Sequence, residues 1–180
     1  MGYRQAQFIW KGVVATVAND KLAILVNTFG SSLISVGREV GIEVALNKAQ
    51  VTQGVKVANV CAASLIGLVG SGIQGTAVIM LDESGFVAVV TAMSGGMIKP
   101  DNNDPMAMSV VGELSNMVSG RSLIQSTMHG VDVTPPQLLS GSDIKNVSTQ
   151  TPGSKCLTLP FAIQPSGTLY LVLSFIAKED

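Results

Sequence analysis

Residues 57–81 read VANVCAASLIGLVGSGIQGTAVIML, an uncharged stretch with a glycine-rich centre. Its length exceeds the roughly 20 apolar residues that a helix needs to cross a bilayer. However, the centre, Gly70 to Gly75, consists of turn-forming residues, and the flanks are rich in the β-branched residues typical of strands. The stretch therefore predicts a buried β-hairpin with strands at 57–69 and 76–81, and no membrane span.

A second hairpin is predicted near the end of the chain, with strands at 157–163 and 168–176 on either side of a Pro- and Gly-containing turn. A long amphipathic helix precedes the first hairpin. Asn19 or Asp20 can cap it, apolar residues then recur at steps of three and four, and Gly41 can end it.

Two further helices are predicted between the hairpins. Residues 82–96 begin with acidic and serine capping residues and end at a glycine pair, which indicates a short helix. Asp104 followed by Pro105 is a strong helix start, and this helix is expected to continue to about His129 and Gly130. Its expected buried side comprises Val110, Val111, Leu114, Met117, Val118, Ile124 and Met128.

The two halves thus share one plan, a long helix followed by a glycine-turned hairpin, which suggests an internal duplication. This order favours an α+β fold, in which long amphipathic helices pack on an antiparallel sheet. The adjacent Pro135 and Pro136 restrict the neighbouring segment to an edge strand at most. We expect one domain over residues 19–180, preceded by an N-terminal extension at 1–18.

The composition excludes several classes of function. The net charge is -1 and the eleven basic residues are scattered, so the chain has no electrostatic footprint for nucleic acid. The single histidine, His129, excludes a two-histidine metal site, and no Gly-x-Ser-x-Gly motif accompanies it. Cys61 and Cys156 lie among apolar neighbours and are interpreted as small core residues.

The second long helix also has a polar face, separate from its expected buried side. At about 100° per residue, Ser109, Glu113, Asn116 and Gly120 fall on one strip, which Gly112 and Ser119 border. Each glycine inside a helix costs roughly 1 kcal/mol relative to alanine. A surface flattened by glycines lets a partner approach Glu113 and Asn116 closely. The alternative interpretation of the same residues is an ordinary solvated helix face.

The sequence from Ser109 to Asn116, Ser-Val-Val-Gly-Glu-Leu-Ser-Asn, resembles the Asp/Ser-x-x-x-Glu-x-x-Asn signature of the CheC, CheX and FliY phosphatases. The Met-Val-Ser-Gly that follows also looks like that family. The order of predicted elements over roughly residues 20–176 is similar to CheX as well.

The first long helix carries no complete copy of the signature. When Asn27 is aligned with Asn116, Ile24 falls at the position of Glu113. A second partial copy begins at Ser35 but has Ile42 at the asparagine position. One complete site resembles CheX more than the two-site CheC.

This resemblance implies a phosphatase that hydrolyses the aspartyl phosphate of a CheY-like response regulator in chemotaxis or other two-component signalling. Asn116 would orient the attacking water and Glu113 would pair with a lysine of the regulator, while Ser109, Gly112 and Gly120 would contact that partner. The resemblance implies no cofactor on this chain, because the regulator holds the Mg²⁺. It also implies a homodimer, and the chain is expected to be cytoplasmic.

Two alternatives differ in function class. Gly70 to Gly75 matches the Gly-x-Gly-x-x-Gly pattern of dinucleotide-binding proteins, but a strand-like segment follows it in place of a helix. The stronger alternative is a catalytically silent docking module of the flagellar-switch type, which would bind a response regulator without hydrolysing its phosphate.

Overall fold

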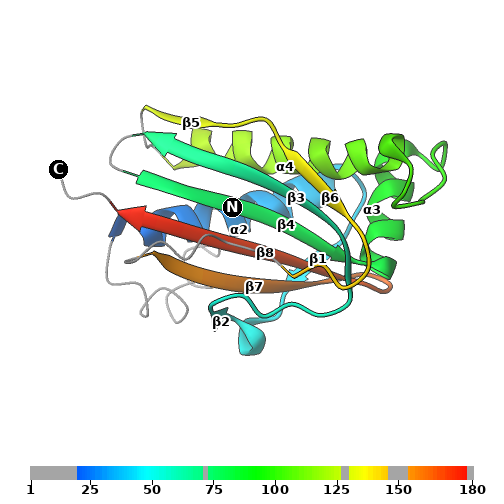
Figure 1. Cartoon of the computed structure of the whole chain (residues 1–180), viewed down its shortest axis with the longest axis horizontal. Coiled ribbons are helices and arrows are strands. Elements are labelled where there is room, and N and C mark those ends of the chain that lie inside the picture. Colours follow the sequence, from blue (N-terminus) through cyan, green and yellow to red (C-terminus); the bar gives the residue numbers. More distant parts are fainter. Residues whose placement is uncertain (1–19, 71–72, 127–129, 146–153, 178–180) are drawn as a thin grey trace, which may run out of the picture.

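Two glycine-turned hairpins meet edge to edge at the centre of the fold. The first hairpin is formed by β3 (Val60–Gly70) and β4 (Ile73–Asp82), and the second by β7 (Lys155–Ile163) and β8 (Thr168–Ala177). Strand β4 pairs antiparallel with β8 from Ile73 opposite Ala177 to Leu81 opposite Leu169. This pairing joins the two halves of the chain into one sheet (Figure 1).

The computed structural model describes residues 20–70, 73–126, 130–145 and 154–177. The predicted extension at 1–18, together with Met128 and His129, lies outside these residues. The remaining elements are α2 (Asp20–Glu39), β1 (Val44–Leu46), the 3-10 turn η1 (Lys48–Gln50), β2 (Thr52–Gln53), α3 (Glu83–Ser94), α4 (Pro105–Gln125), β5 (Val131–Val133) and β6 (Gln137–Ser140).

Four short strands extend the sheet, and each half of the chain supplies them to the hairpin of the other half. Strands β1 and β2, from the first half, pair with β7 of the second. Strands β5 and β6, from the second half, pair with β3 of the first. Within the described residues this gives an eight-stranded antiparallel sheet in the order β1-β7-β8-β4-β3-β5, with β2 beside β7 and β6 beside β3.

Helices α2 and α4 lie on one face of this sheet (Figure 1). Alternate residues of the central strands point toward them, as a pleated strand requires. The main apolar cluster lies between the layers and includes Leu25, Phe29, Leu33, Ile79, Leu81, Val111, Leu114, Val118, Leu171 and Leu173. This arrangement confirms the predicted α+β fold, in which long helices cover an antiparallel sheet.

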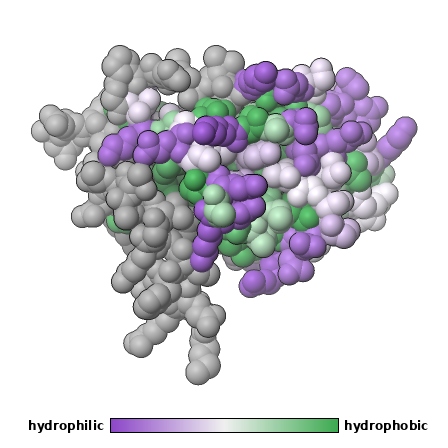
Figure 2. All heavy atoms as spheres, turned by 90° about the horizontal axis from the view of Figure 1, so that it is seen from below, coloured by the Kyte–Doolittle hydropathy of each residue, from purple (hydrophilic) through white to green (hydrophobic). Residues whose placement is uncertain are grey.

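The other face of the sheet carries a smaller cluster, in which Met80 and Val172 are fully buried and Val55, Val57 and Ile144 pack against them. Figure 2 shows the molecule from below the view of Figure 1, where hydrophilic side chains surround smaller hydrophobic areas. Among the described residues, no helix is both long enough and apolar enough to be a candidate membrane span. The apolar stretch 57–81 is the predicted hairpin, β3 and β4.

The helix ends are capped largely as the sequence indicates. Asp82 accepts a hydrogen bond from the amide of Gly85 at 2.7 Å, and Gly95 ends α3 with a left-handed conformation, φ 61°. Asp104 accepts from the amide of Met106 at 2.9 Å at the start of α4. The helix ends at Gln125, earlier than predicted.

One predicted core residue of α4 is not in the core. Ile124 is 84% exposed, because the buried side of α4 is shifted toward its small residues. Ser115, Ser119 and Ser122 are buried there, and the Ser122 hydroxyl donates to the Thr28 hydroxyl of α2 at 3.0 Å. Apolar periodicity alone does not reveal a helix contact made of serines.

A substitution at Gly75 tests the central pairing. A Cβ built there would lie 2.3 Å from the Ser174 carbonyl oxygen and 2.3 Å from Cδ1 of Phe175 on β8. Gly75→Ala is therefore expected to lower the free energy of unfolding by roughly 2 kcal/mol, since β4 and β8 must separate to admit the methyl group. Urea denaturation measures this loss. The exposed neighbour supplies the control, Gln74→Ala, and an equal effect of both substitutions would contradict the explanation.

Candidate functional site

The polar face of α4 is open to solvent along the middle of the helix. Ser109, Glu113 and Asn116 are all exposed, and Glu113 and Asn116 lie one turn apart. The Ser109 hydroxyl donates to the Met106 carbonyl at 2.7 Å. Gly120 continues this line, and a Cβ built on it would meet no atom within 4 Å. We call Ser109, Glu113, Asn116 and Gly120 the strip.

Gly112 has a different environment from the strip. It is buried, and a Cβ built on it would lie 3.2 Å from Cδ2 of Leu138 and 3.8 Å from Cβ of Pro136. The missing side chain therefore lets the β6 segment approach α4, so Gly112 does not itself present a surface. Leu138 lies beside the strip at this point, a neighbour that the sequence analysis did not identify because it comes from a distant segment.

The backbone beneath Asn116 is held by a buried hydroxyl. Ser119 is 1% exposed, and its hydroxyl donates to the carbonyl oxygens of Ser115, at 2.7 Å, and Asn116, at 3.2 Å. Serine hydroxyls that bond back to the preceding helical turn tend to bend a helix locally. The Asn116 side chain is thus exposed, while the Asn116 carbonyl oxygen accepts a hydrogen bond from the Ser119 hydroxyl within the helix.

Helix α2 does not present a second pair. Ile24 is 40% exposed at the position that aligns with Glu113, and Asn27 is half-buried. The side chains of the partial signature that begins at Ser35 already have a partner within the chain. Arg121 of α4 donates to the Ser35 hydroxyl at 2.9 Å and to both carboxylate oxygens of Glu39 at 2.6 and 2.7 Å. The Glu39 carboxylate therefore links α2 to α4.

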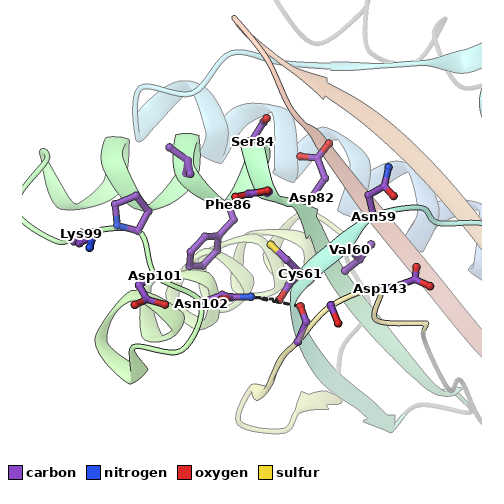
Figure 3. Close-up of a pocket in the computed structure, with 15 residues that line it drawn as sticks. Asn59, Val60, Cys61, Asp82, Ser84, Phe86, Lys99, Asp101, Asn102 and Asp143 are labelled. Atoms are coloured by element: carbon purple, nitrogen blue, oxygen red, sulfur yellow. Dashed lines mark hydrogen bonds between the residues drawn. The ribbon is translucent and has the colours of Figure 1, made fainter.

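A polar pocket of about 800 Å³ opens elsewhere, where the start of α3 meets the loops at 99–102 and 141–143 (Figure 3). The Asn102 amide nitrogen donates to the carbonyl oxygens of Cys61, at 3.2 Å, and Gly141, at 3.4 Å. Asp82 caps α3 and also accepts from the amide of Thr168 at 2.9 Å. These lining side chains therefore connect the loops to the sheet.

The charge of this pocket disfavours a phosphorylated ligand. Asp82, Glu83, Asp101 and Asp143 line it, whereas Lys99 is the single lining cation. Burial raises the pKa of the Cys61 thiol, and Glu83 and Asp82 raise it further. An excess of carboxylates repels phosphate. In the described part of the chain, no group of three or more His, Cys, Asp or Glu side chains is placed to hold a metal ion.

The chain is similar in sequence to chemotaxis phosphatases. The family model described as chemotaxis phosphatase CheX matches residues 62–162, a segment that contains the whole strip. The chain is 33% identical over 126 residues to the CheY-P phosphatase CheX of Thermotoga maritima, an alignment that covers 68% of this chain and 79% of the relative.

Solved structures share the fold. A CheC-like superfamily protein from Shewanella sp. PV-4 superimposes with a TM-score of 0.68 at 25% identity, over 84% of this chain and 97% of the other. The CheX-CheY-BeF3-Mg²⁺ complex from Borrelia burgdorferi gives a TM-score of 0.63 at 20% identity, with 84% and 97% covered.

The two helical glycines make a matched test of the local geometry. Gly120→Ala is expected to raise the free energy of unfolding by about 1 kcal/mol, because alanine favours the helix and the added methyl meets no neighbour. Gly112→Ala should show no such gain, since its methyl would press against Leu138. Thermal and urea denaturation of both variants measure this difference. A gain of equal size at both positions would show that Leu138 does not contact the helix as described.

The Arg121–Glu39 pair predicts a pH dependence. The hydrogen bond from Arg121 holds the pKa of Glu39 below its ordinary value of 4.5. Because the pKa of Glu39 is lower in the folded state than in the unfolded state, its ionised carboxylate stabilises the fold above pH 4.5. This stabilisation is lost as the pH falls through the folded-state pKa and the carboxylate becomes protonated. Arg121→Gln should therefore be less stable than wild type at pH 7, and the difference should close below pH 4.5.

Urea titrations at several pH values test this, and Arg38→Gln, at an exposed arginine of α2, is the control. A difference between wild type and Arg121→Gln that stays constant down to acid pH would contradict the assignment.

Proposed function

The chain belongs to the family of the chemotaxis phosphatase CheX, and we propose that it hydrolyses the aspartyl phosphate of a CheY-like response regulator. The observation that carries this proposal is the exposure of Glu113 and Asn116, one turn apart at the middle of α4. Their exposure suits a reaction that takes place inside another protein, because side chains that project from a helix can enter a partner's site.

Hydrolysis of an aspartyl phosphate needs no covalent intermediate on this chain. A water oxygen attacks phosphorus, the bond between phosphorus and the aspartyl oxygen breaks, and the products are the free carboxylate and inorganic phosphate. Phosphoryl transfer of this kind depends mainly on positioning and on charge stabilisation. The helix therefore needs to contribute groups that hold the water in line.

Asn116 is suited to orient the water. Its amide both donates and accepts hydrogen bonds, and it does not titrate, so its hydrogen bonding is the same across the physiological pH range. Two residues three positions apart on a helix are neighbours, about 5–6 Å apart at Cβ. Asn116 and Glu113 can therefore enter one partner site together.

Glu113 is suited to fix the register of the two proteins. A charge-assisted bond between its carboxylate and a lysine beside the phosphoryl group would be stronger than a neutral hydrogen bond. The Mg²⁺ that neutralises the developing charge belongs to the regulator in this scheme. The strip would then act by placing side chains, with Ser109 and Gly120 in contact with the regulator.

Asn116→Ala is expected to reduce the rate of phosphate loss from a phosphorylated receiver domain about a hundredfold or more, because it removes the group that positions the water. The measurement is the decay of the phosphorylated receiver domain with and without the chain. Asn47→Ala, at an exposed asparagine before η1, is the matched control and should leave the rate unchanged. An Asn116→Ala protein of normal fold and wild-type rate would reject the catalytic assignment.

Glu113→Gln is expected to raise the KM for the phosphorylated regulator and to lower kcat, since the charge that pairs with the regulator's lysine is lost. Glu43→Gln, at an exposed glutamate before β1, is the matched control. Tight binding of the phosphorylated regulator by the wild-type chain, without faster phosphate loss, would favour the docking-module alternative.

A further inference from the structure

Large apolar side chains are exposed around the strip. Met106 is 62% exposed and Ile124 is 84% exposed, and both lie on α4. Leu138 of β6 is 40% exposed and packs beside Gly112. Single exposed apolar side chains are common on protein surfaces. These three are notable because of their positions around the strip. We call Met106, Ile124 and Leu138 the rim.

The rim flanks the candidate catalytic pair on both sides. Met106 and Ile124 are separated by about five helical turns and so project in nearly the same direction. Glu113 lies between them, within about 20° of that direction at 100° per residue. Leu138 borders the opposite side of the strip, next to Gly112. A partner whose phosphoryl group meets Asn116 must therefore cover apolar side chains as well.

The charges around the strip favour a different protein as the partner over a second copy of this chain. Glu113 and Arg121 are the only charged residues of α4, and Arg121 is bound to Glu39. An interface between two copies centred on the strip would bring two Glu113 carboxylates together by symmetry, without a cation to neutralise them. A receiver domain that offers a lysine supplies the missing charge.

The size of the rim also fits such a partner. From Met106 to Ile124 the helix extends about 27 Å at 1.5 Å per residue, close to the diameter of a small domain. Along the helix axis, Met106 lies about 15 Å and Ile124 about 12 Å from Asn116, no more than the radius of such a domain.

We propose that Met106, Ile124 and Leu138 form an apolar docking rim for the receiver domain of the phosphorylated regulator, an inference that rests on the proposed function. The rim supplies affinity and the strip supplies the chemistry. Contacts that are equal in the ground state and the transition state lower KM without raising kcat. The rim and the strip are therefore separable by kinetics.

Met106→Ser and Ile124→Ser test this division of roles. Each substitution is expected to raise the KM for the phosphorylated receiver domain about tenfold, and the double variant about a hundredfold, because each removes apolar area that is buried only in the complex. The kcat of all three variants should stay within about twofold of wild type. The conservative variants Met106→Leu and Ile124→Leu should restore near-normal KM. Val87→Ser, at an α3 side chain that is 41% exposed, is the control.

A double variant with unchanged KM, or a control that raises KM equally, would overturn the proposal. Sedimentation of the chain alone provides a second test, because a change of oligomeric state in the serine variants would assign the rim to contact between copies. Direct titration of the receiver domain separates this inference from the proposed function. If wild-type and Asn116→Ala proteins give equal phosphate loss, the proposed function fails, while weaker binding by the serine variants would still support the rim.

Discussion

The pairing of β4 with β8 is the constraint on which the rest of the fold depends. It joins two hairpins that are far apart in sequence, and it sets which residues of both strands point toward the helices. Ala77, Ile79 and Leu81 lie opposite Leu173, Leu171 and Leu169, and all six are buried on that face. A slip of one residue would turn this apolar set to the other face. Because α4 packs on the same surface, the register also determines which side of α4 is left for the strip.

Much of this architecture could be predicted from the sequence because its signals are local. The glycine-rich centre of residues 57–81 specifies a hairpin, and Asp104 with Pro105 specifies a helix start. Helical periodicity then places Ser109, Glu113 and Asn116 on one exposed side, as the structure has them. The roles of these residues in catalysis and partner contact remain predictions, since they concern a second protein.

What the sequence did not reveal depends on contacts between distant segments. Strands β1 and β2 are only three and two residues long, too short for a sequence pattern to identify, and they form because β7 offers an edge for pairing. The burial of Gly112 depends on Leu138, and the exposure of Ile124 depends on serines that fill the contact with α2. Arg121 and Glu39 likewise meet only after the helices have packed.

The exchange of short strands between the halves affects how this protein can evolve. Neither half is a self-contained unit, because each completes the sheet of its counterpart. Gene fission at the midpoint would leave both fragments with a bare strand edge, which invites aggregation. The outward side chains of either long helix can nevertheless vary without disturbing the shared sheet. The two long helices accordingly differ on their outward sides, since α2 carries the apolar Ile24 at the position that aligns with Glu113 of α4.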